Sequence, residues 1–221
     1  MTAGAHDATV DVSRIRTAGI AGVTMPVMFF GIVALLTWLE YDFLKAQGMS
    51  LLQAYDAEIP WPSGLARGPW GFLQTLNFLA LGALAAVFLR GIRTQFHRGW
   101  AARIATFFLG IYAFDGILNA MRVDLPGEST IWGSAHLIGF GLINLCIVIG
   151  VPAAGLALRR NPDWSGLWKV SLAWPILLIG AFVFADLVVP GALGFAPALL
   201  VLTGWFALAG RRLLVISRAA G

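Results

Sequence analysis

The sequence predicts an all-α, polytopic membrane protein built as a bundle of six transmembrane helices. Six apolar stretches are each about long enough to cross a bilayer, and short connections separate most of them. Hydrophobic residues make up 59% of the 221-residue chain and charged residues only 12%, unlike a soluble domain of this size. A hydrocarbon core of ~30 Å requires about 20 apolar residues in a helix, and it offers no water to an open backbone.

The six predicted helices follow one another with few charges inside them. In chain order they run from Arg16 to Glu40, Pro69 to Arg90, Gly99 to Met121, Ile131 to Ala157, Trp168 to Val188 and Gly194 to Ala209. Residues 1–15 are expected to form a mobile N-terminal arm, residues 16–213 the membrane domain and residues 214–221 a tail. The longest connection, from Tyr41 to Gly68, is expected to fold over one mouth of the bundle.

The Lys and Arg residues predict how the bundle faces the membrane. Most of them lie in the N-terminal arm, the second and fourth connections and the tail, whereas acidic residues such as Asp42 and Asp124 lie in the first and third connections. Six crossings place the four basic regions on one face, and basic loops face the cytoplasm. We therefore expect a multi-pass protein of a cytoplasmic (bacterial inner) membrane with both termini in the cytoplasm.

The partners expected from this pattern are membrane lipids and, in one of the alternatives below, other membrane-protein subunits. The net charge of +4 does not indicate nucleic-acid binding. The basic residues are spread along the loop edges and form no compact patch with interleaved aromatic residues.

Polar residues inside the predicted helices indicate the candidate functional site, because ionisable side chains are costly in a membrane. Asp115, Asn119 and Arg122 follow one another at spacings of four and three, which places them on one helical face. Asp124 follows in the next loop, and His136 lies about one turn inside the fourth helix. We predict that these five residues line an outward-facing ligand-binding pocket. Arg122 is expected to pair with Asp115 or Asp124.

Three further polar residues are candidates for supporting roles at this pocket. Glu40 ends the first predicted helix, Asn77 lies in the second and Asp186 lies near the end of the fifth. Solvation at the membrane interface is the alternative interpretation of Glu40 and Asp186, and hydrogen bonding between helices is the alternative for Asn77.

The sequence assigns no metal site and identifies no cofactor. Haem held by two histidines needs two of them in the membrane, and only His136 of the three is placed there. A zinc site of His and Cys fails for the same reason, and the single cysteine, Cys146, is expected to be a buried apolar filler. Isolated serines such as Ser63 and Ser134 are expected in turns or helix packing, and no nucleophile motif is recognised.

Several short motifs resemble those of a known family. They are Trp61-Pro-Ser-Gly-Leu, Gly68-Pro-Trp-Gly-Phe-Leu-Gln-Thr-Leu-Asn-Phe, Asp115-Gly-Ile, Val123-Asp-Leu-Pro-Gly and Ser134-Ala-His. Together, over roughly Tyr55 to Gly155, they resemble the six-helix bacterial membrane family catalogued as domain of unknown function 998. That family typically has a Pro and Asp pair followed by a His; Asp124 and His136 match, while Val123 replaces the Pro. The resemblance implies the six-helix fold and no established activity.

Three functions remain open at this point. The first is binding of a small amphiphile, lipid headgroup or hydrophobic cofactor in the outward-facing pocket, without catalysis. The second is an accessory or assembly subunit of a larger membrane complex, in which the polar residues only hold helices together. The third is a membrane-embedded hydrolase or transferase with His136 as base and Asp115 or Asp124 as its orienter. The convergence of polar residues on one side favours the first function, and the absence of a complete catalytic constellation favours the second.

Overall fold

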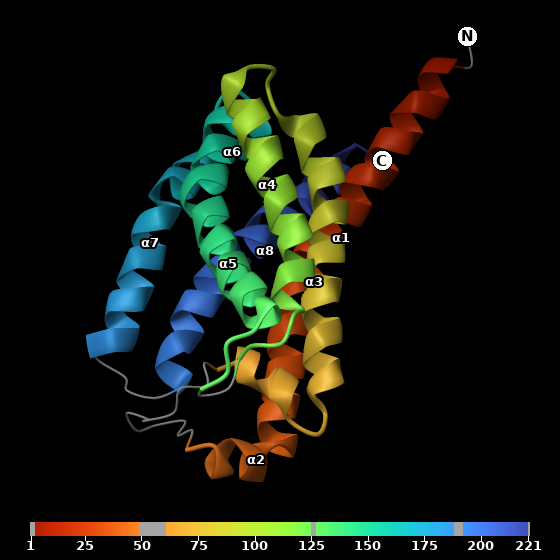
Figure 1. The fold of residues 1–221 in the computed structure, drawn as a ribbon. Helices are drawn as coiled ribbons and strands as arrows, with labels where there is room; N and C mark the ends of the chain where they lie inside the picture. The colour runs from red at the N-terminus through yellow and green to blue at the C-terminus, as the bar shows by residue number, and fades with distance from the viewer. Residues whose placement is uncertain (1–2, 49–60, 125–126, 188–191, 221) are drawn as a thin grey trace.

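The computed structural model describes residues 3–48, 61–124, 127–187 and 192–220, and the regular elements in these ranges are all helical (Figure 1). Six helices in them are long and apolar enough to cross a membrane, which confirms the predicted fold class. These spans are Val12–Leu39, Gly71–Gln95, Trp100–Asn119, Ile131–Leu158, Leu167–Ala185 and Leu193–Ala219.

The long helices form the bundle and the short ones form its connections. The long helices are α1 (Ala3–Leu39), α3 (Gly71–Ile92), α4 (Trp100–Asn119), α5 (Ile131–Leu145), α6 (Val151–Leu158), α7 (Leu167–Leu187) and α8 (Ala196–Ala219). The short ones are α2 (Tyr41–Ala46) and the 3₁₀ helices η1 (Ser63–Arg67), η2 (Arg93–Gln95), η4 (Pro162–Trp164) and η5 (Ala192–Phe195). Helices α5 and α6 belong to one span and are joined by the π-helical segment η3 (Cys146–Gly150).

The first and last long helices, α1 and α8, extend beyond the limits predicted for them, into the segments near the two termini. Residues 3–15, expected as a separate arm, are helical and continue into the first span as part of α1. Helix α8 continues past Arg211 and Arg212 to Ala219 and includes most of the expected tail. Charged residues end an apolar stretch without ending a helix, because Arg is itself a good helix former.

Close helix contacts hold the bundle together around α1, α3 and α4. Helix α1 packs against α3 and α8, and α3 packs against α4. A Cβ atom on Gly82 of α3 would lie 2.5 Å from the carbonyl oxygen of Ala113, and one on Gly116 of α4 would lie 2.7 Å from the carbonyl oxygen of Phe78. Glycine at both positions therefore allows the two backbones to touch, as is common between membrane helices.

The outer surface of the bundle is apolar. Val27, Phe107, Leu137 and Ile176 come from four different spans, and each is more than 60% exposed. Soluble monomers rarely expose apolar side chains on this scale. This surface agrees with a multi-pass membrane protein.

The two ends of the bundle differ in charge and in the connecting segments that lie over them. The N-terminus, η2, η4 and the C-terminus share one end, which carries the basic segments (Figure 1). Helix α2, η1, the α4–α5 connection and η5 gather at the opposite end, here called the η1 end. The first connection thus covers one mouth of the bundle in the part that the structure describes.

Candidate functional site

A cavity of about 380 Å³ lies toward the η1 end of the bundle, bounded by η1 and by α1, α3, α4, α5 and α8. Its walls are mostly apolar, and its polar lining is small. The apolar residues include Phe29, Phe78, Leu81, Phe140, Leu199 and Leu202; the polar ones are Ser63, Tyr112, Asp115, Asn119, His136 and Thr203. Such a volume lies at the lower end of the range for small-molecule sites, ~300–1,000 Å³.

Three of the five predicted pocket residues line this cavity. Asp115, Asn119 and His136 do so, whereas Arg122 and Asp124 are absent from its lining. The first two come together because a spacing of four places them on the same face of α4. His136 reaches them because α5 packs against α4.

Asp115 is buried with one of its carboxyl oxygens unsatisfied. Its side chain is only 1% exposed, and its Oδ2 accepts a hydrogen bond of 2.5 Å from the Asn119 Nδ2. Its Oδ1 finds no hydrogen-bond partner among the described residues. A Cβ atom on Gly139 of α5 would come within 2.9 Å of that oxygen, so glycine keeps the space beside it free. A buried polar atom without a partner costs free energy until a partner is supplied.

His136 is buried and held through both ring nitrogens. The Nδ1 atom lies 3.0 Å from the Met121 carbonyl oxygen, and the Nε2 atom lies 2.8 Å from the Ser63 Oγ. A carbonyl oxygen accepts only, so Nδ1 carries a proton; in the neutral ring, Nε2 then accepts from the Ser63 hydroxyl. The ring also packs edge-on against Phe78 of α3.

Ser63, Tyr112 and Thr203 line this site without having been predicted there, and Ser63 is the one that contacts His136. It was expected in a turn or in packing, and it instead starts η1, lines the cavity and donates to His136. The two residues are 73 positions apart, and only the fold of the first connection brings them together. Both stand in the short motifs quoted above, which is the one sequence signal that links them.

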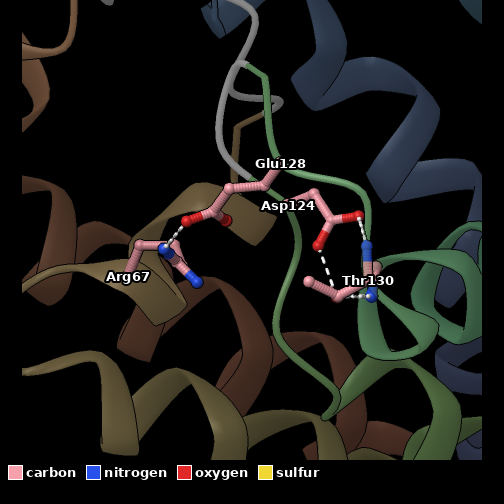
Figure 2. A network of polar contacts seen from close by, with 5 residues as sticks. Arg67, Asp124, Glu128 and Thr130 are labelled. Carbon is pink, nitrogen blue, oxygen red and sulfur yellow. Dashed lines mark hydrogen bonds and ion pairs between the residues drawn. The ribbon is translucent and has the colours of Figure 1, made fainter.

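Asp124 organises the start of α5 and does not line the pocket. Its Oδ2 accepts from the Thr130 backbone N–H at 2.9 Å and its Oδ1 from the Thr130 hydroxyl at 2.6 Å (Figure 2). The Thr130 hydroxyl oxygen accepts in turn from the Gly133 N–H and so caps the helix. The side-chain and backbone hydrogen bonds from Thr130 lower the pKa of Asp124. These contacts give Asp124 a role in loop structure, apart from the residues that line the cavity.

The predicted ion pair of Arg122 with Asp115 or Asp124 is not formed. Helix α4 ends at Asn119, so Arg122 leaves the helical face that the spacing assumed, and its side chain is exposed. Among described side chains the ion pair at this end joins Arg67 of η1 to Glu128, at 3.0 Å (Figure 2).

The three supporting candidates have different outcomes. Glu40 is 2% exposed and accepts from the Trp70 backbone N–H at 2.7 Å, so it caps α3 rather than being solvated. Burial raises the pKa of Glu40, and the Trp70 hydrogen bond partly offsets this rise. Asn77 is fully buried and donates to the Phe29 carbonyl oxygen of α1, which links two helices. The Asp186 side chain lies outside the described part of the structure.

No group of three or more His, Cys, Asp and Glu side chains in the described ranges is placed to hold a metal ion. Comparison with protein-family models, with curated proteins and with solved structures gives no significant match to this chain.

Proposed function

We propose that this protein binds a small single-chain amphiphile in the cavity at the η1 end. The observation that carries the proposal is the Asp115 Oδ1. It is a buried oxygen without a partner in the described residues, on a residue that lines an otherwise largely apolar cavity. A hydroxyl on the ligand suits this position because it donates to an ionised carboxylate and accepts from a neutral carboxyl.

The walls of the cavity support an apolar chain as the other part of the ligand. Aromatic and aliphatic side chains from α1, α3, α5 and α8 provide the contact surface. The volume of about 380 Å³ favours one chain over a whole two-chain lipid.

The basic residues support an outward-facing site. If the basic end faces the cytoplasm of a cell with this protein in its cytoplasmic membrane, the η1 end opens to the outer leaflet. The ligand would then enter from lipid or from the outer aqueous phase. The resemblance to the family named above agrees with this topology and adds no activity.

A purely accessory role is supported less well by these contacts. In that role the buried polar groups would only join helices, as Asn77 does by its bond to α1. The Asp115 Oδ1 joins nothing in the described structure, and a cavity lies beside its residue.

The proposal is tested by native mass spectrometry of the full chain in lipid nanodiscs. The probe is 1-O-decylglycerol, an ether, and decyl methyl ether is the matched ligand without hydroxyl groups. Wild-type protein should retain one 1-O-decylglycerol and prefer it to decyl methyl ether. The double variant Asp115→Leu/Asn119→Leu should lose this preference, while Asn144→Leu should keep it.

Asn144 is a suitable control because it lies in α5 and bonds to its own helix without lining the cavity. Retention of neither ligand by the wild type would overturn the proposal, and an unchanged preference in the double variant would remove Asp115 from it.

A further inference from the structure

We propose that Ser63 and His136 form a catalytic dyad that hydrolyses a single-chain carboxylic ester bound in the cavity. This inference rests on the proposed function, because such an ester is an amphiphile of the class described above. It goes beyond binding in assigning a nucleophile, a base and a reaction.

The geometry is that of an activated serine. The Ser63 Oγ lies 2.8 Å from the His136 Nε2, within the ~2.6–3.2 Å expected between a nucleophile and its general base. On the other side of the ring, the Met121 carbonyl oxygen accepts from Nδ1 at 3.0 Å. This contact fixes the tautomer and the orientation of the ring, which is the part that a carboxylate plays in many triads. Neither Asp115 nor Asp124 is needed as the orienter.

Neighbouring contacts hold the two members of the dyad in place. The Trp61 Nε1–H, two residues before Ser63, donates to the Thr37 hydroxyl of α1 at 3.0 Å. Leu65, two residues after it, is fully buried. The ion pair between Arg67 and Glu128 then ties η1 to the connection that leads into α5 (Figure 2). Contacts of this kind preorganise a site before its substrate arrives.

Both members of the dyad can meet a substrate, because both line the cavity. Ser63 is half-buried and stands where η1 meets the mouth of the bundle. The apolar walls would hold the acyl chain, which places the ester carbonyl near the polar residues. The inferred substrate class is therefore a single-chain ester.

The reaction balances with water as the only co-reactant. Ser63 Oγ bonds to the ester carbonyl carbon while its proton moves to His136 Nε2. The bond from that carbon to the alcohol oxygen then breaks, and the alcohol leaves with the proton from Nε2. Water from the outer phase next gives one proton to Nε2 and its oxygen to the acyl carbon. The bond to Oγ breaks, Oγ regains its proton and a carboxylic acid leaves.

The test uses the full chain in nanodiscs and two probes. A decyl fluorophosphonate should phosphonylate Ser63 with loss of fluoride, and this is detected by the intact mass and by the modified peptide. Hydrolysis of p-nitrophenyl decanoate should be followed by release of p-nitrophenolate. Ser63→Ala should abolish the labelling, and His136→Gln should slow both reactions about 10²- to 10⁴-fold. Ser134→Ala is the matched control, since Ser134 is an exposed serine on the same helix as His136, and it should react like the wild type.

Retention of 1-O-decylglycerol, which has no ester to cleave, separates this inference from the proposed function. If wild-type protein retains that ligand but is not labelled, the dyad is structural and the binding function stands. Labelling at another serine, or labelling of His136→Gln at the wild-type rate, would also overturn the dyad. If the wild type shows neither retention nor labelling, both proposals fail. Ligand retention by Ser63→Ala would show that loss of labelling is not loss of fold.

Discussion

The contact between α3 and α4 gives a sharp prediction, because glycine is the residue that permits it. A Cβ atom on Gly82 would lie 2.5 Å from the Ala113 carbonyl oxygen and 3.1 Å from the Gly116 Cα. Both neighbours are backbone atoms, so no side-chain rotation relieves the overlap. We expect Gly82→Ala to push α3 and α4 apart and to destabilise the fold.

The expected size of this effect follows from a comparison with a second glycine. A Cβ atom on Gly141 of α5 would meet nothing within 4 Å. Both Gly→Ala changes gain the same helix propensity, roughly 1 kcal/mol, so it cancels between them. The remaining difference is the cost of overpacking, about 1–3 kcal/mol. At about 2–4 °C per kcal/mol for a chain of this size, Gly82→Ala should melt about 2–12 °C below Gly141→Ala.

Thermal unfolding of both variants in one detergent, followed by circular dichroism, measures this difference. Gly82 also lines the cavity, so Gly82→Ala should retain less 1-O-decylglycerol than Gly141→Ala. Equal melting temperatures would refute the backbone contact between α3 and α4 as described.

Three further predictions concern the buried carboxyl, the loop carboxylate and the orientation. Asp115→Leu leaves the Asn119 amide without its side-chain acceptor and should lower the free energy of unfolding by about 1–3 kcal/mol. The double variant Asp115→Leu/Asn119→Leu should recover most of that loss. Equal melting temperatures of the single and double variants would contradict this. Asp124 has a lowered pKa, so it stabilises the fold above the ordinary value of about 3.9 and loses this effect as pH falls through its lower folded-state value. Wild-type and Asp124→Asn melting temperatures should therefore converge in acid, and a gap that widens on acidification would have the wrong sign. An impermeant maleimide added outside cells should modify Ser129→Cys and spare Ser165→Cys, both exposed serine positions at opposite ends; the reverse pattern would invert the orientation.

The spans and one pair of site residues were predictable because they depend on local properties of the chain. Length and apolar composition define a membrane helix without any tertiary contact. The spacing of Asp115 and Asn119 likewise fixes their common face, and the structure joins them by a hydrogen bond. Arg122 shows the limit of this reasoning, because the periodicity that placed it applies only while the helix continues, and α4 ends at Asn119.

The rest of the site depends on contacts between distant segments. Ser63 meets His136 only after the first connection folds onto the bundle, and no period in the sequence encodes that meeting. The third group at the Ser63–His136 contact is the backbone carbonyl of Met121. Every residue type has such a carbonyl, so the sequence cannot indicate its role. Gly133 is a similar case. A Cβ atom there would lie 2.0 Å from the Asp124 Oδ2, so the side chain of a residue nine positions earlier requires glycine at this position.

The π-helical segment η3 gives the fourth span an angular offset between its two halves. Pro152 lacks an N–H, so it cannot bond to the carbonyl of Val148, and the wider turn accommodates that gap. One residue of an α-helix corresponds to about 100° of rotation, so the extra residue in this turn sets which side of α5 faces α4. A one-residue deletion within 146–150 would thus act as a rotation more than as a shortening. It would turn His136 and Gly139 away from α4 while the span still crossed the membrane. The orientation of these site residues can therefore change without affecting membrane insertion of the helix.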